Sequence, residues 1–156
     1  IKVAFYKENS KQENPEYEIF IETGREKTGL ELFEWIDTIQ KMKVGEIIVT
    51  EIPLEGRNKG FNLGLYKNLR KRVDVQLVAH GGAGPFENIA GLFKDADVDA
   101  VSIASLFHYN NIKYISSSIK KGSIAFVNSL KKEDMVGTTV TNLKKYLSSQ
   151  GIMVRI

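Results

Sequence analysis

The segment VQLVAHGGAG, residues 75–84, decides how we interpret this sequence. A short apolar run breaks directly into three glycines within four residues, a pattern that predicts a buried strand feeding a turn with few Cβ atoms. Residues 85–93 then have the pattern of a helix whose positive N-terminus would face that turn. Main-chain amides in such a turn can approach an anion closely, so the segment indicates a phosphate site, although glycine clusters after strands are also common as plain turns.

A second apolar run, residues 100–108, ends in the small pair Ala104 and Ser105 about one βα unit further along the chain. In parallel αβ architectures ligands gather at the carboxyl ends of strands, and barrels often seat a phosphate between neighbouring βα loops. We therefore expect Gly81, Gly82, Ala104 and Ser105 to donate backbone or hydroxyl hydrogen bonds to one phosphate group.

The composition excludes several classes of function. A length of 156 residues suits one domain with a substantial core. The formal net charge is only +3 and the basic residues lie among carboxylates, whereas a nucleic-acid partner would need a concentrated basic face. The most basic run, residues 67–72, lies beside Leu65, Leu69 and Val73 at helical spacing, so we interpret it as the solvated face of a helix.

Cysteine and histidine usage narrows the chemistry further. The absence of cysteine rules out thiolate chemistry and disulfides and fits a reducing, cytoplasmic location. His80 and His108 are the only histidines and neither belongs to a spaced ligand motif, so we expect no metal site and no cofactor. No apolar run approaches the roughly 20 residues that a membrane-spanning helix needs, so we expect no membrane partner.

The remaining patterns alternate between strands and helices. Strands at residues 1–6 and 16–23 are expected to form a hairpin, and residues 23–29 a polar loop. An amphipathic helix at 30–42, a strand at 45–52 and a helix at about 62–73 then lead into the segment quoted above. Strict alternation of this kind argues for successive βα units in a parallel sheet.

Residues 110–139 interrupt the alternation of strands and helices, and we interpret them as an insertion of uncertain structure. A last helix is expected at 142–149, with Thr141 as its N-cap and Gly151 as its C-cap. The total is about four βα units plus a hairpin, half of an eight-stranded TIM barrel, which takes roughly 250 residues. Half a barrel would expose an apolar inner face, and Ile1 already lies in a strand pattern, so we expect the chain to be part of a longer polypeptide.

Several motifs occur in an order and at a spacing that a single motif could not specify. They are Thr23-Gly24 with Thr28-Gly29, residues 45–50, Glu55-Gly56, residues 59–62, residues 79–84, residues 104–108, and residues 143–147 with Gly151 and Val154-Arg155. Together they resemble the C-terminal half of the cyclase subunit of imidazole glycerol phosphate synthase and its relatives. The resemblance runs nearly end to end and leaves out only the expected insertion.

The resemblance implies a (βα)8 barrel of two similar halves, each with one phosphate site, acting on a ribonucleotide that carries a phosphate at either end. A glutaminase partner would deliver ammonia through the barrel, and the cyclase would cleave and close its substrate into imidazole glycerol phosphate and an aminoimidazole carboxamide ribotide. The resemblance places Gly56, Gly81, Gly82, Ala104 and Ser105 around one terminal phosphate, which agrees with the interpretation from the residues alone.

The resemblance also implies that Glu55 is one of two acidic residues that act as general acid and base, the other lying in the half not present. Here the sequence departs from the family pattern, which has aspartates at the positions of Pro53 and Glu55 and a serine where His80 stands. Because proton transfer needs hydrogen-bond reach, the longer side chain of Glu55 alters the geometry of that step. Thr50 and His80 are expected at the substrate mouth, and His108 is expected to pack or cap.

Two alternatives stay open beside the cyclase hypothesis. A paralogue of the same barrel, working with a glutaminase, would help convert a sugar acetamido group into an acetamidino group in surface polysaccharide synthesis. Loss of the paired aspartates with the phosphate loops kept suits such a relative. The third hypothesis is a non-catalytic, phosphate-binding half barrel that pairs with another half.

Overall fold

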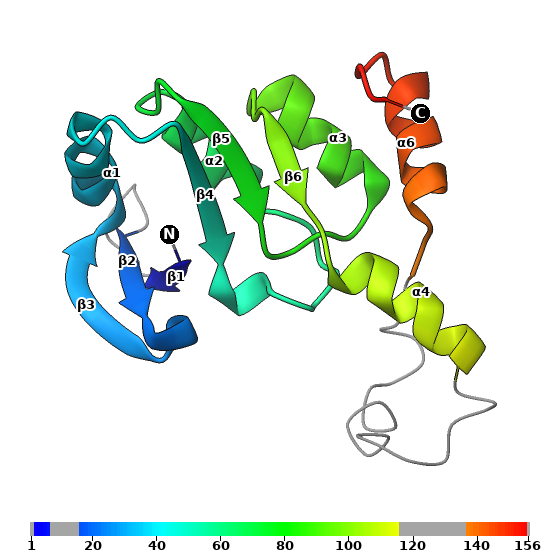
Figure 1. The fold of residues 1–156 in the computed structure, drawn as a ribbon, viewed down its shortest axis with the longest axis horizontal. Coiled ribbons are helices and arrows are strands. Elements are labelled where there is room, and N and C mark those ends of the chain that lie inside the picture. Colours follow the sequence, from blue (N-terminus) through cyan, green and yellow to red (C-terminus); the bar gives the residue numbers. More distant parts are fainter. Residues whose placement is uncertain (1, 7–15, 116–136, 156) are drawn as a thin grey trace.

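The computed structural model describes residues 2–6, 16–115 and 137–155, and these residues form one twisted sheet with helices packed on it (Figure 1). The strand order is β3-β2-β1-β4-β5-β6. The strands are β1 (Lys2–Tyr6), β2 (Glu16–Ile21), β3 (Glu26–Glu31), β4 (Glu46–Glu51), β5 (Gln76–His80) and β6 (Ala100–Ser102). The helices are α1 (Leu32–Lys41), α2 (Leu63–Arg70), α3 (Phe86–Asp95), α4 (Ser105–Ile115) and α6 (Val140–Ser149), with short 3-10 turns η1 (Glu22–Gly24) and η2 (Ile52–Leu54).

Strands β1, β4, β5 and β6 are parallel neighbours, and α2 and α3 connect β4 to β5 and β5 to β6. The arrowheads of β4, β5 and β6 therefore point the same way in Figure 1, and α4 starts where β6 ends. The predicted α/β fold with successive βα units is confirmed. Because parallel strands end at a common edge, the loops that follow β4, β5 and β6 are brought together there.

The helices begin where the sequence offers capping side chains. The Glu31 carboxylate accepts hydrogen bonds from the amides of Phe33 (2.8 Å) and Glu34 (3.0 Å) at the start of α1. The Asn62 side-chain oxygen accepts the amide of Leu65 at 3.1 Å at the start of α2. Such caps satisfy amides that have no acceptor inside the helix.

The expected polar loop at residues 23–29 is wrong in its second half, because residues from Glu26 onward form β3 against β2. The polar side chains themselves pair the strands: the Thr28 hydroxyl donates to the Ile19 carbonyl at 2.7 Å, and the Gly29 amide donates to the Glu18 carboxylate at 3.1 Å. A polar composition therefore does not prevent a strand at the edge of a sheet, where one side faces water.

Two expectations for the C-terminal part also change. Residues 110–115, placed in the expected insertion, continue α4, while residues 116–136 lie outside the described residues. The last helix starts at Val140, and its N-cap is Thr139, whose hydroxyl accepts the Asn142 amide at 3.1 Å, so the prediction of Thr141 as the cap is wrong. The C-cap is Gln150, one residue before the expected Gly151, which follows it with a φ of +78°.

The two faces of the parallel strands differ in burial. Side chains alternate between faces along a strand, and on β4 and β5 one set packs under the helices, including Val49 and Leu77, both 0% exposed. The other set is unevenly buried: Ile48 is 42% exposed, whereas Val78 and Thr50 are 6% and 5% exposed. In Figure 1 this open face of β4–β6 is turned toward the viewer, and no helix of the described residues crosses it.

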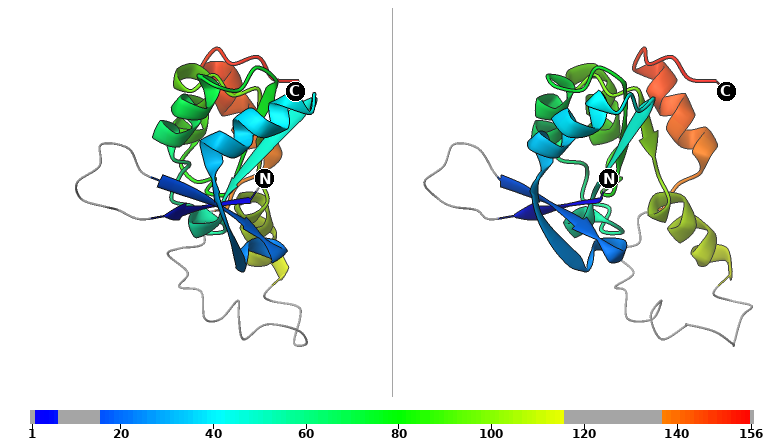
Figure 2. Two further views of the ribbon diagram at one scale, coloured as in Figure 1. Left: turned by 90° about the vertical axis from the view of Figure 1, so that its left-hand side faces the viewer. Right: turned by 60° about the vertical axis from the view of Figure 1, so that its left-hand side comes forward.

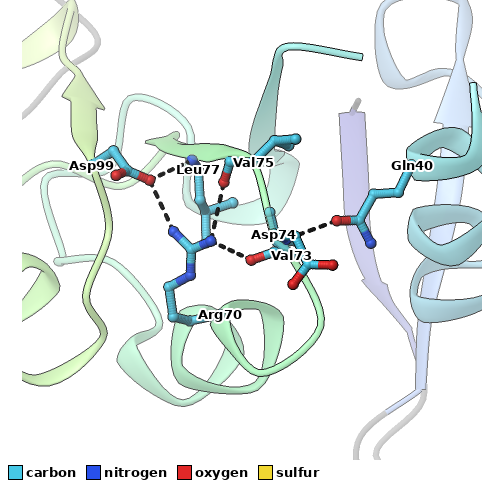
Figure 3. A network of polar contacts seen from close by, with 7 residues as sticks. All are labelled: Gln40, Arg70, Val73, Asp74, Val75, Leu77 and Asp99. Atoms are coloured by element: carbon cyan, nitrogen blue, oxygen red, sulfur yellow. Dashed lines mark hydrogen bonds and ion pairs between the residues drawn. The ribbon is translucent and has the colours of Figure 1, made fainter. Parts of the chain in front are cut away.

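A polar network holds the amino ends of the strands, at the edge opposite the βα loops (Figure 3). The Arg70 guanidinium at the end of α2 pairs with Asp99 at 2.8 Å and donates to the carbonyls of Val73 and Val75. Asp99 also accepts the Leu77 amide at 2.7 Å, which joins β5 to the chain entering β6. Nearby, Gln40 of α1 accepts the Asp74 amide at 2.7 Å and donates to the Arg72 carbonyl at 2.8 Å.

The strands of the N-terminal part and the last helix lie at opposite ends of the molecule. Figure 2 shows β1–β3, in blue, away from α6, in orange to red. Helix α6 packs against α3, where the rings of Phe86 and Tyr146 lie 5.3 Å apart. Within the described residues, no helix combines the length and apolar character that crossing a bilayer requires.

Candidate functional site

A cavity of about 350 Å³ lies at the carboxyl ends of β5 and β6. Its size falls in the range of small-molecule sites. It is lined by Glu55, Gly56, His80, Gly81, Gly82, Ala83, Ser102, Ile103, Ala104, Ser105 and His108. Every site residue expected from the sequence is in this lining except Thr50, which lies directly behind His80. Three βα loops that are distant in sequence therefore meet at one hollow.

The turn after β5 can be made only by glycine. Gly81 has a φ of +80° and Gly82 a φ of +122°, conformations that side chains rarely adopt. A Cβ on Gly81 would lie 2.8 Å from the Glu51 carbonyl oxygen, and one on Gly82 would lie 2.9 Å from the Gly60 carbonyl oxygen. The Gly60 amide donates to the Gly82 carbonyl at 2.8 Å, so the turn is fastened to the loop that follows β4.

The loop after β6 is short and leads straight into α4. The Ala104 carbonyl accepts the amides of Phe107 (3.1 Å) and His108 (3.0 Å), which fixes the first turn of the helix beside the cavity. The Ser105 hydroxyl is 3.3 Å from the side-chain oxygen of Asn58, in the loop after β4. The first amides of α4 have no acceptor within the helix, so they are available to a ligand at its N-terminus.

Glu55 stands at the end of the short turn η2, on the third side of the cavity. Its amide donates to the Ile52 carbonyl at 3.1 Å, while its side chain is exposed. The next residue, Gly56, has a φ of +73° and its carbonyl accepts the Tyr109 hydroxyl of α4 at 3.2 Å. Contacts from α4 therefore position both the loop after β6, which carries Ala104, and the loop after β4, which carries Glu55.

Asn88 of α3, which the sequence interpretation missed, fixes the far end of the Glu55 loop. Its side-chain oxygen accepts the Phe61 amide at 2.5 Å, and its side-chain nitrogen donates to the Phe61 carbonyl at 3.0 Å. Gly60, with a φ of +101°, passes so close that a Cβ would lie 2.9 Å from the Asn88 carboxamide carbon. No local sequence signal marks Asn88, because its partner is 27 positions away in the chain.

His80 and Thr50 face one another across neighbouring strands. They are paired in the register of β4 and β5, and Thr50 Oγ1 lies 3.0 Å from His80 Nδ1. Behind the sheet, the buried hydroxyl of Tyr66 donates to the Val49 carbonyl at 2.9 Å and accepts the His80 amide at 3.3 Å. Burial raises the pKa of the Tyr66 hydroxyl, so it stays protonated and holds the backbone under His80.

His108 lies on another element, on the first turn of α4. It is exposed and lines the cavity, and a distance of 6.2 Å from its ring to that of the adjacent Tyr109 does not bury it, so the expectation that it packs is not met. Both histidines of the chain therefore face the same hollow.

Glu51, the last residue of β4, is a second feature that the sequence interpretation missed. Its side chain is 3% exposed and faces the helices, and its Oε2 atom has no hydrogen-bond partner among the described residues. Burial raises the pKa of the Glu51 carboxyl, and hydrogen bonding by Asn62 offsets the rise only in part. The signal was present in the sequence, since Glu51 follows Ile47 and Val49 at the two-residue period of a buried strand face.

The cavity is lined mainly by small and uncharged residues, with one carboxylate. The lining offers backbone amides, the hydroxyls of Ser102 and Ser105, and the imidazoles of His80 and His108. Its single carboxylate is that of Glu55. The described part of the chain contains no cluster of three or more histidine, aspartate or glutamate residues able to hold a metal ion. The arrangement can bind an anionic group at the glycine turn while Glu55 exchanges a proton nearby.

The fold and the cavity define the class: an α/β protein of parallel βα units with a small-residue ligand site at the carboxyl ends of its strands. The chain belongs to the family described as Histidine biosynthesis protein, which matches residues 5–113. The resemblance to this family is thereby confirmed for that part of the chain.

Two curated relatives carry the same description, Imidazole glycerol phosphate synthase subunit HisF. The protein from Alkaliphilus metalliredigens is 38% identical over 96 residues, which cover 62% of this chain and 38% of the relative. The protein from a Synechococcus strain is 34% identical over 100 residues, which cover 64% of this chain and 39% of the relative. The chain thus matches about two fifths of the length of each relative.

Proposed function

We propose that this chain is the C-terminal half of a (βα)8 barrel and that the complete protein is a cyclase of the imidazole glycerol phosphate synthase type. The observation that carries the proposal is the gathering of Glu55, the glycine turn and the Ala104-Ser105 pair around one cavity. Family membership and the printed names of the relatives support the same activity. The substrate is a ribonucleotide with a phosphate at either end.

The cavity binds one terminal phosphate of this substrate. Gly56, Gly81, Gly82 and Ala104 offer backbone amides, and Ser105 adds a hydroxyl. Removing the Cβ atoms lets the main chain approach the phosphate oxygens, and the N-terminus of α4 adds the favourable end of a helix dipole. Thr50 orients His80 at the mouth of the site.

Glu55 acts as a general acid and base beside the bound phosphate. Its side chain is exposed at the rim, which is the position from which a carboxylate can reach a substrate that fills the cavity. The ammonia comes from a glutaminase partner, and the second acid lies in the N-terminal half of the barrel. That half covers the open face of β4–β6, and the assembly works in the cytoplasm.

The decisive test is turnover by the complete protein supplied with ammonium salts and the bis-phosphorylated ribonucleotide, with imidazole glycerol phosphate measured as the product. Glu55→Gln is expected to lower kcat by about 10²–10⁴-fold, the usual contribution of one general acid or base. Glu26→Gln, an exposed carboxylate on β3 away from the cavity, is the matched control and keeps wild-type turnover. Equal turnover in the two variants would contradict the role of Glu55.

The half-barrel arrangement has its own test, the stability of core variants in the complete protein. Leu77→Ala on the helix-covered face should lower the free energy of unfolding by about 2–5 kcal/mol. Ile48→Ala should be comparably destabilising if a second half covers the open face. A change below about 0.5 kcal/mol, typical of exposed positions, would show that Ile48 stays in water and that the face is not covered.

A second candidate function is the paralogue that serves acetamido-to-acetamidino sugar modification together with a glutaminase. Pro53, at the start of η2, favours it, because a proline stands where the family has one of its paired aspartates. This candidate predicts phosphate binding and a dependence on Glu55 without imidazole glycerol phosphate formation. A non-catalytic half barrel predicts phosphate binding that is accompanied by no turnover of either kind.

A further inference from the structure

We infer that the anion site in this cavity is proton-linked, with His80 and His108, which both line it, acquiring positive charge as an anion binds. The inference rests on the proposed phosphate site and adds to it the means by which the charge of the phosphate is balanced. Its basis is the set of ionisable side chains that the three loops bring to the cavity.

The cavity offers an anion few permanent charges. Among the described residues that line it, none is a lysine or arginine, and the ionisable ones are Glu55, His80 and His108. Arg57 and Lys59 occupy the same loop as Glu55, but both are exposed and neither is in the lining. A doubly charged ligand is therefore met by neutral donors, one carboxylate that repels it and two imidazoles that can become cations.

His80 is held so that one ring nitrogen is left for the ligand. Its Nδ1 atom is engaged by Thr50 at 3.0 Å, and within the described residues its Nε2 atom has no hydrogen-bond partner. Thr50 on β4 and Ser102 on β6, its register neighbours, are uncharged. The buried Glu51 carboxyl faces the helices from the other side of the sheet, so within the described residues the charged groups on the cavity side are Glu55 and His108.

His108 is placed so that its protonation depends on the ligand. It lies on the first turn of α4 and lines the cavity. An anion bound there interacts favourably with both the positive end of the helix dipole and an imidazolium. Protonation of His108 and anion binding therefore reinforce one another.

The consequence is that the affinity for an anion depends on pH because protein side chains, and not only the ligand, change their charge. Histidine is the side chain that changes charge between about pH 5 and 8, so affinity for a dianion should fall as the pH rises across that range. By linkage, binding at an intermediate pH should take up protons from solution. A site built from lysines or arginines would show neither effect between pH 5.5 and 8, because those side chains stay charged.

The test is isothermal titration calorimetry of the complete protein with sodium sulfate from pH 5.5 to 8 at constant ionic strength. Sulfate is the probe because it remains a dianion throughout, whereas a phosphate ester itself titrates near pH 6. We expect about tenfold tighter binding at pH 5.5 than at pH 8, the change that one pKa unit of coupling produces. Repeating the titration in buffers of different ionisation enthalpy should reveal net proton uptake within this pH range.

The variants assign the effect to these residues. His80→Gln and His108→Gln keep hydrogen-bonding capacity but cannot become cations, so each should reduce proton uptake, and the double variant should bind sulfate with a flat pH profile. Any other anion site in the complete protein contributes equally to wild type and double variant, so their difference belongs to this cavity. Glu55→Gln should tighten sulfate binding, since it removes the repelling carboxylate.

The possible outcomes separate this inference from the proposed function. Sulfate binding with no proton uptake, or with uptake that persists in the double variant, would overturn the proton linkage and leave the phosphate site in place. A folded protein in which the wild type, the double variant and Gly82→Ala bind sulfate identically at every pH would instead remove the phosphate site, and the linkage with it.

Discussion

The two ends of the parallel strands use polar groups in opposite ways. At the amino ends, Arg70, Asp99 and Gln40 direct their hydrogen bonds at neighbouring backbone groups and at each other (Figure 3). At the carboxyl ends, glycine amides, hydroxyls and two imidazoles surround a cavity instead. The contrast teaches that one end of this sheet stabilises the fold while the other keeps hydrogen-bonding capacity for a ligand.

Among substitutions at the two ends of the strands, the largest effect on stability is expected at the amino ends. Arg70→Ala should lower the free energy of unfolding by about 2–3 kcal/mol, because it removes charge-assisted hydrogen bonds from a side chain that is only 21% exposed. Arg72→Ala, two residues along, breaks an exposed ion pair with Asp37 and should lower it by less than about 1 kcal/mol. Urea unfolding of both variants measures the difference. Equal losses would remove the distinction between a network and a surface pair.

Gly82→Ala should destabilise the protein by about 1–3 kcal/mol and lower sulfate affinity at least tenfold. The methyl group would combine a strained φ of +122° with a close approach to the Gly60 carbonyl. Gly29→Ala is the matched control, because Gly29 has a φ of +73° but no atom within 4 Å of its Cβ position. Gly29→Ala should lower the free energy of unfolding by less than Gly82→Ala does, and it should bind sulfate with wild-type affinity. Normal sulfate binding by Gly82→Ala would contradict the role of this turn.

Tyr66→Phe should have a smaller effect, about 1–2 kcal/mol in the free energy of unfolding. The substitution leaves the Val49 carbonyl and the His80 amide without their shared buried partner. Tyr109→Phe removes an exposed hydroxyl contact to Gly56 and should change stability by less than about 0.5 kcal/mol. Thermal unfolding of the two variants at equal pH makes the comparison.

The last prediction concerns pH and Glu51. Because its pKa is raised in the folded protein, the native state binds more protons than the unfolded state, so its contribution to stability is complete below the ordinary value of 4.5 and is lost as the pH rises through the raised value. Glu51→Gln should therefore be more stable than wild type at pH 8, and the difference should shrink toward pH 4. A stability difference between the two proteins that stays constant across that pH range would contradict a raised pKa of Glu51.

The parts of the fold and site that were predictable share a local cause. A glycine cluster reports its own backbone conformation, so Gly81 and Gly82 could be assigned to a turn from sequence, and parallel topology brings Ala104 and Ser105 beside them. Strand alternation and helical spacing likewise placed β4, α2, β5 and α3 to within a few residues.

What escaped prediction depends on partners distant in the chain. Strand β3 exists because Thr28 and Gly29 find acceptors on β2, which composition does not reveal. The Thr139 cap competes with Thr141 for the same helix start, and only the position of the Asn142 amide decides between them. Glu51 is an ionisable residue on a buried face, and its environment is set by packing rather than by its neighbours in sequence.

The two hydrogen bonds between Asn88 and the backbone of Phe61 have an evolutionary and engineering consequence. They attach the acid-bearing loop to a helix that belongs to the next βα unit, so the reach of Glu55 can be retuned from outside the loop itself. A carboxylate at position 88 would accept a hydrogen bond from the Phe61 amide but could not donate one to the Phe61 carbonyl. The loop would then be held by one hydrogen bond instead of two. Libraries that aim to change the reaction could therefore vary this scaffold position while every group lining the cavity is kept.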